Sequence, residues 1–68
     1  MNTIASERVR MGITQEELAK KVDKSKKTVS NWETGRRSPQ ATDLEKLSKL
    51  FGCSTDYLLG LTEERKTS

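Results

Sequence analysis

The chain has 68 residues, which is enough for one domain but close to the lower limit for folding around a single hydrophobic core. Hydrophobic residues make up 31% of it and charged residues 34%, so composition fits either a small helical bundle or a disordered segment. A single cysteine and no histidine exclude an intramolecular disulfide and a Cys/His zinc cluster, and no apolar run approaches the roughly 20 residues of a membrane span. We therefore expect a soluble cytoplasmic protein without a metal, a cofactor or a membrane contact.

Helix start and stop signals predict two short helices in the N-terminal third. The first covers residues 4–11, where Val9 is expected beside the buried stripe, and it stops at Gly12. Thr14-Gln15-Glu16-Glu17 forms a capping box, in which the side chain of Thr14 and that of Glu17 each accept from the other residue's backbone amide. The second helix is expected over residues 15–22.

The same signals predict a third helix in the middle of the chain and a fourth after its only proline. Ser25 caps the third helix, which runs over residues 26–34 and stops at Gly35. For the fourth helix two starts are open, because either Gln40 or a second capping box at Thr42 can cap it.

A fifth helix is predicted from Ser54, its N-cap, to Gly60, and the polar tail over residues 62–68 is expected to fray. Cys53, just before this helix, is expected to be a small buried residue rather than a reactive thiol. No segment shows the period-2 alternation of a strand, so the fold class is all-α.

The basic charge belongs to one segment, residues 20–37. It contains seven lysines or arginines and two acids, a net charge of +5, whereas the rest of the chain carries −2 of the total of +3. Such clustering is expected for a protein that binds a polyanion. A solvated helix face would give the same clustering, so charge alone leaves both interpretations open.

A helical wheel divides the third helix into two faces. Val29 and Trp32 share the inward side, whereas Lys27, Ser30 and Asn31 face outward with no acid among them. Lysine can donate to guanine or to phosphate, and asparagine can pair with adenine in the major groove. The outward face therefore favours nucleic acid. Because the other aromatic residues needed for stacking on single strands are missing, duplex DNA is the favoured form.

Glu33 lies at the edge of the inward side, where an isolated carboxylate is costly to desolvate. Arg8, at the edge of the first helix's buried face, can pair with it. We expect an Arg8–Glu33 ion pair between the first and third helices; two separately solvated side chains are the alternative.

Taken together, these residues resemble the Cro and phage-repressor (XRE-type) family of helix-turn-helix regulators. The matching positions are Gly12-Ile13-Thr14-Gln15-Glu16-Glu17-Leu18-Ala19, Val22, Ser25, Val29, Trp32-Glu33-Thr34-Gly35, Pro39, Leu44-Glu45-Lys46-Leu47, Phe51-Gly52, Ser54 and Asp56-Tyr57-Leu58-Leu59-Gly60. The resemblance implies a lambda-repressor-like five-helix bundle over residues 1–61. Its second and third helices would form the helix-turn-helix, and two copies would bind a palindromic operator as a homodimer.

The resemblance also implies roles for individual residues. By position, Lys26, Lys27 and Asn31 would read bases, while Thr14, Gln15, Thr28, Ser30, Arg36 and Arg37 would contact the DNA backbone. The third helix, residues 26–34, would be the recognition helix and enter the major groove. Gln15 would also brace this helix, and Arg8 with Glu33 matches the family's interhelical pair. The tentative dimer surface comes from an excess of apolar residues around the fifth helix, namely Tyr57, Leu58, Leu59 and Leu61; the alternative is that Leu58 and one neighbour only complete the core.

Four positions depart from the family pattern. Glu7 stands where leucine is common, which thins the apolar stripe of the first helix. Asp23 stands where glycine is usual, so we expect a less regular turn. Lysines at 26 and 27 discriminate bases less well than glutamine or arginine, and either can be a phosphate contact instead.

No residue pattern supports catalysis, so an enzyme is not expected. The favoured function is a DNA-binding transcriptional regulator, either a prophage-type repressor or a Cro-like protein, on the nucleoid of a bacterial or phage-infected cell. One alternative is the DNA-binding antitoxin of a toxin–antitoxin pair. The other is a protein-interaction module that has lost DNA binding, against which the lysine-rich outward face argues. No small-molecule ligand is evident.

Overall fold

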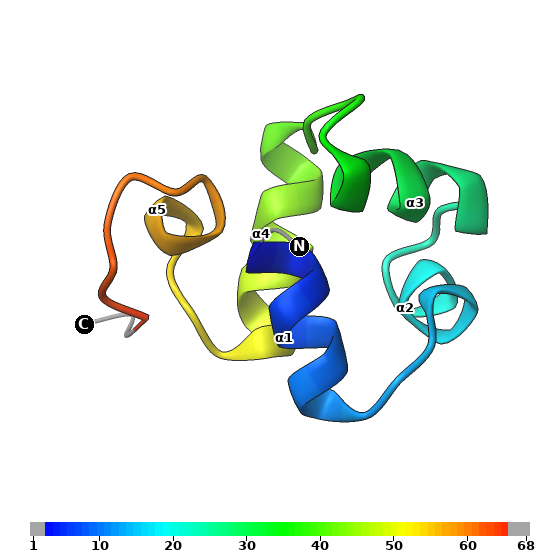
Figure 1. Cartoon of the computed structure of the whole chain (residues 1–68), viewed down its shortest axis with the longest axis horizontal. Helices are drawn as coiled ribbons and strands as arrows, with labels where there is room; N and C mark the ends of the chain where they lie inside the picture. Colours follow the sequence, from blue (N-terminus) through cyan, green and yellow to red (C-terminus); the bar gives the residue numbers. More distant parts are fainter. Residues whose placement is uncertain (1–2, 66–68) are drawn as a thin grey trace.

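The computed structural model describes residues 3–65, and all regular secondary structure in this range is helical. The elements are α1 (Thr3–Met11), α2 (Gln15–Lys21), α3 (Lys26–Thr34), α4 (Ala41–Phe51) and α5 (Thr55–Leu58). In Figure 1, α1 lies against α4 in the middle, α2 and α3 lie on one side, and α5 lies on the other. The all-α prediction of five helices is confirmed. Within this part of the chain, no helix is both long and apolar enough to cross a lipid bilayer.

Side-chain caps start the helices as predicted. The Thr14 hydroxyl accepts from the Glu17 amide at 3.1 Å, and the Glu17 carboxylate accepts from the Thr14 amide at 2.9 Å. This backbone hydrogen bond lowers the pKa of the Glu17 carboxyl. Ser25 and Ser54 cap α3 and α5 in the same way, with amide-to-hydroxyl distances of 3.1 and 3.0 Å.

The start of α4 was the ambiguous one, and the structure places Gln40 at the N-cap. The Asp43 carboxylate reaches back and accepts from the Gln40 amide at 3.2 Å. Thr42 is therefore inside the helix, and the alternative start at that residue is wrong.

Each helix ends close to a residue with a left-handed backbone conformation, and the five are Gly12, Asp23, Gly35, Gly52 and Gly60. Asp23, with φ of +58°, is the one residue of these five that is not a glycine. Its amide donates to Lys20 O at 3.3 Å and the Lys24 amide donates to Ala19 O at 2.8 Å, which is the Schellman pattern that a glycine would give. The expectation of a less regular turn is therefore wrong. Asp23 forms the same turn as a glycine would, although the left-handed conformation is strained for a residue that has a Cβ.

The hydrophobic core joins all five helices, and Val29 and Trp32 are buried in it as the wheel predicted. Cys53 is completely buried, and this burial raises the pKa of its thiol, as expected for a packed residue. The prediction for the first helix is wrong at Val9. Val9 is 54% exposed, and the buried place goes to Glu7, which is only 3% exposed.

The buried Glu7 carboxylate is paired with two guanidinium groups. Arg10 Nε donates to it at 3.1 Å, and Arg65 Nη2 donates at 2.6 Å. Both arginines also donate to the carbonyl of Phe51 at the end of α4, at 3.2 Å from Arg10 and 2.6 Å from Arg65. The tail therefore does not fray before Arg65; the rest of its predicted range, residues 66–68, lies outside the described residues.

We predict that Asp23→Gly is more stable to unfolding than Asp23→Ala by about 1 kcal/mol, because alanine keeps the Cβ that makes the left-handed conformation costly. Both variants remove the same charge, so their difference isolates the backbone effect. Urea denaturation followed by circular dichroism measures it. Equal midpoints would show that φ at this position costs nothing.

Acid should expose the contribution of Glu7 to stability. The hydrogen bond from Arg65 is the main reason that the pKa of Glu7 is lowered from 4.5, so folding gains from its charged form above that pH and loses the gain as pH falls through the lowered value. Glu7→Leu removes this group, and we expect its urea midpoint to rise relative to wild type as pH drops below 4.5. A difference that stays constant from neutral to acid pH would contradict the pairing.

Candidate nucleic-acid interface

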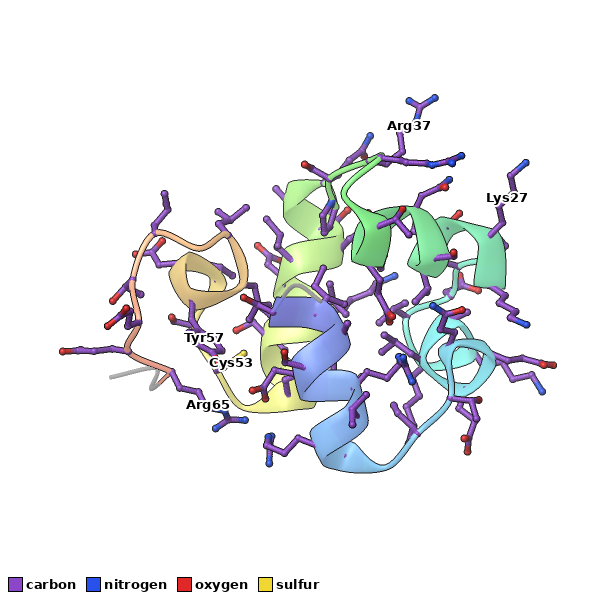
Figure 2. The ribbon with its side chains drawn as sticks, in the orientation of Figure 1. Lys27, Arg37, Cys53, Tyr57 and Arg65 are labelled. Atoms are coloured by element: carbon purple, nitrogen blue, oxygen red, sulfur yellow. The ribbon has the colours of Figure 1, made fainter. Side chains whose placement is uncertain are left out.

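The third helix is held by its inward residues and leaves its opposite side open. Val29 is fully buried and Trp32 is 3% exposed, whereas Lys26 and Lys27 are exposed and Ser30 is half-buried. Figure 2 shows Lys27 projecting from the start of α3 away from the rest of the molecule. The outward face predicted from the sequence is thus on the surface.

The positive charge around this face is not neutralised by ion pairs within the part of the chain that the structure describes. Among residues 3–65, no acid lies within ion-pair distance of Lys26, Lys27, Arg36 or Arg37. A surface helix that serves only solubility normally mixes both signs of charge. The arrangement leaves these cations available for an external anion.

The two arginines after α3 are positioned by the backbone of Asn31. Its carbonyl oxygen accepts from the Arg36 amide at 3.0 Å and from the Arg37 amide at 3.3 Å. Gly35, with φ of +82°, makes this reversal of the chain possible. In Figure 2, Arg37 consequently extends from the same side of the molecule as Lys27.

A groove of about 330 Å³ runs between α3 and the start of α4. It is lined by Lys24, Thr28, Asn31, Trp32, Arg37, Ser38, Gln40 and Asp43. The groove brings together three predicted residues, Thr28, Asn31 and Arg37. It adds Lys24, Ser38 and Gln40, which the sequence analysis did not assign to the site. Of these three, only Lys24 could have been suspected from the sequence, because it belongs to the basic segment. Ser38 and Gln40 reach the groove only through the packing of α4.

Lys24 differs from the other lysines of the basic segment. Its Nζ lies 3.4 Å from Oδ1 of Asp43, a carboxylate that is almost completely buried and also caps α4. This pair fixes the turn between α2 and α3 against the start of α4. One lysine of the predicted basic segment is therefore paired with an acid inside the fold.

The expected ion pair between α1 and α3 is present. Arg8 Nε donates to Glu33 Oε2 at 2.7 Å and Arg8 Nη2 donates to Glu33 Oε1 at 3.2 Å. The bidentate contact raises the pKa of Arg8. A third donor of the same guanidinium, Nη1, reaches the carbonyl of Ile13 at 2.9 Å, so the loop before α2 is tied in as well.

Gln15 connects α2 to the same pair. Its side-chain amide donates to Glu33 Oε1 at 3.1 Å, so the first residue of α2 is braced against α3. A second open hollow, of about 460 Å³, lies beside it and is lined by Arg8, Gly12, Ile13, Thr14, Gln15, Glu16 and Lys26. Thr14 and Gln15 thus line the same hollow as Lys26.

The residues predicted for a dimer surface fall into two groups. Leu58 is 8% exposed and belongs to the core, so it is not available to a partner. Tyr57 is half-buried against the core, while Leu59 and Leu61 are 48% and 73% exposed. The apolar surface at this end of the molecule is therefore smaller than predicted and consists mainly of these two leucines.

A family model described as Helix-turn-helix matches residues 4–58, nearly all of the bundle described above. The chain belongs to this family, that of the Cro and phage-repressor regulators. No solved structure gives a significant match to it. Among the residues described, no group of three or more histidines, cysteines, aspartates or glutamates could hold a metal ion.

Two curated relatives of this helix-turn-helix protein are named as a transcriptional regulator and as a repressor. The HTH-type transcriptional regulator ImmR of Bacillus subtilis is 44% identical over 59 residues, which cover 87% of this chain and 46% of the relative. The repressor protein C2 of Salmonella phage P22 is 39% identical over 56 residues, 82% of this chain and 26% of the relative. The chain thus spans less than half the length of these relatives.

We predict that Glu33→Gln lowers the free energy of unfolding by about 1.5 to 3 kcal/mol, the range for a hydrogen bond to a charged group, because the glutamine side chain is uncharged and keeps only one acceptor oxygen, so Arg8 loses its charged bidentate partner. Glu16→Gln, at an exposed position of α2, removes the same charge and is the matched control. Thermal and urea unfolding of the two variants decide the question. An unchanged midpoint for Glu33→Gln would mean that the pair does not stabilise the fold.

Proposed function

We propose that this protein is a sequence-specific regulator that binds duplex DNA with α3 in the major groove. The observation that carries the proposal is the outward face of α3, which offers Lys27, Ser30 and Asn31 with no acid among them and with the lysine charges unpaired inside the described residues. The major groove admits a helix and presents the acceptors that such side chains recognise.

The proposed roles of individual residues follow from the family resemblance by position, and the acid-free outward face of α3 supports those of Lys27, Ser30 and Asn31. Lys26, Lys27 and Asn31 contact base edges, with asparagine on adenine and the lysines on guanine. The DNA backbone is held by Thr14, Gln15, Thr28, Ser30, Arg36 and Arg37. The groove between α3 and α4 supports the last of these roles, because it places Arg37 beside Thr28 and Asn31 with Lys24 on its wall. Phosphate contacts fix the register in which the bases are read.

We further propose that the regulator is a repressor and acts as a homodimer on an operator with two-fold symmetry. The name of the relative from phage P22 supports the first part. Support for the second comes from the small size of the domain, since a single recognition helix contacts few base pairs and specificity rises when two half-sites are read together. Leu59 and Leu61 provide exposed apolar side chains for that contact.

Selection from random duplex DNA at several salt concentrations tests the proposed function, and we expect an enriched motif made of two symmetric half-sites. Lys27→Ala should weaken binding. If the lysine reads a base, the motif relaxes at one position; if it contacts phosphate only, all sequences weaken equally and the salt slope falls by about one. Asn31→Ala should relax one position at a cost of about 1 to 3 kcal/mol.

Lys49→Ala removes an exposed lysine near the end of α4 and serves as the control for lost charge outside the interface. Its motif and salt slope should equal those of wild type. Recovery of no enriched motif with the wild-type protein would refute sequence-specific binding, and an unchanged motif for Asn31→Ala would refute base reading by that residue.

A further inference from the structure

The feature that the proposed function does not use is the buried carboxylate of Glu7. Its side chain is only 4% exposed, yet it occupies the inward side of α1, where an apolar residue would serve the core without needing a partner. A carboxylate in such a place must be compensated by cations and hydrogen bonds. Arg10 is one of its two partners, but the side chain of Arg10 is 52% exposed.

Arg65, 58 positions along the chain, is the other partner and makes the closer contacts. Its Nε donates to both carboxylate oxygens at 3.1 Å, and its Nη2 donates to Oε1 at 2.6 Å. The same Nη2 donates to the carbonyl of Phe51 at 2.6 Å, which places a cation at the C-terminal end of α4, where the helix dipole favours one. One guanidinium thus joins the segment after α5 to α1 and to α4.

The backbone of Arg65 adds a third connection. Its carbonyl accepts from the amide of Ser54, the N-cap residue of α5, at 3.0 Å. The segment from Ser54 to Arg65 contains α5, turns at Gly60 and comes back to Ser54. Its two ends are therefore hydrogen-bonded to each other. Leu59 and Leu61 lie within it and face solvent.

We propose that Glu7 and Arg65 form a latch that holds residues 59–65 against the domain and orders Leu59 and Leu61 before a second copy of the chain binds them. The use of these leucines rests on the homodimer proposed above, whereas the latch itself does not. The latch places the end of the folded domain at or beyond Arg65 rather than at residue 61. Figure 2 shows Arg65 at the opposite end of the molecule from Lys27 and Arg37, so the chain leaves the domain away from the proposed DNA face.

A positional role explains why position 7 holds a carboxylate rather than an apolar residue. The paired carboxylate stabilises the fold relative to its protonated form, but not relative to a well-packed leucine. Replacing a buried ion pair by well-packed apolar residues is often neutral or stabilising, so leucine at position 7 would serve the core at least as well. Leucine cannot hold Arg65. Glu7→Leu therefore separates the two roles, since it should keep the folded core and release the segment.

Hydrogen exchange of the Ser54 amide, followed by NMR in the DNA-free protein, reads the latch directly. In Glu7→Leu and in Arg65→Gln we expect this amide to exchange about tenfold faster or more, because its acceptor is no longer held in place. The amides of Leu18 and Val29, in the core helices, should keep their wild-type protection. Glu64→Gln, a charge removal at the exposed neighbouring position, is the control and should change none of them.

Sedimentation of the same variants tests the role in association. We expect wild type to dimerise at micromolar concentration and both latch variants to dimerise at least about fivefold more weakly, since the released segment must be ordered on binding. Unchanged Ser54 exchange in both variants would overturn the latch. Faster Ser54 exchange with unchanged dimerisation would refute the role of the latch in association. A monomeric wild type would refute the homodimer, and the exchange data would still test the latch itself.

Discussion

The carboxylate of Glu33 is the point at which the helix-turn-helix is fixed to the rest of the domain. It accepts from Arg8 of α1 and from Gln15 of α2 while belonging to α3, and the same arginine binds the carbonyl of Ile13. Burying this acid is favourable only because its acceptor capacity is filled by charged and amide donors. The orientation of α3 relative to α1 and α2 therefore depends on one charged group rather than on apolar packing alone.

The rest of the structure follows from the shortness of its helices. None of them is long enough to be stable alone in water, so each is closed by a capping side chain at its start or a left-handed residue near its end, and most are closed by both. The core then joins these closed units. Because local caps set where each helix begins and ends, the apolar residues meet in a single arrangement and a small core is sufficient.

Those local signals are why the sequence predicted most of the fold. The ends of α2 and α3, their caps and the Arg8–Glu33 pair could be predicted because each depends on neighbours along the chain or on one helical face. The partners of Glu7 and Lys24 could not, since Arg65 and Asp43 reach them only after α4 and the chain beyond α5 have packed. For the same reason the groove between α3 and α4, with Ser38 and Gln40, gave no signal in the sequence.

The separation of attaching residues from outward residues within α3 has a consequence for the evolution of such a domain. Val29, Trp32 and Glu33 attach the helix, whereas Lys26 and Lys27 have exposed side chains, and Asn31 orders the following turn through its main-chain carbonyl rather than its side chain. Substitutions at these three outward positions leave every attachment intact. Under the proposed DNA-binding function, a lineage could therefore exchange one target sequence for another by a few surface mutations, without first acquiring spare stability to survive them.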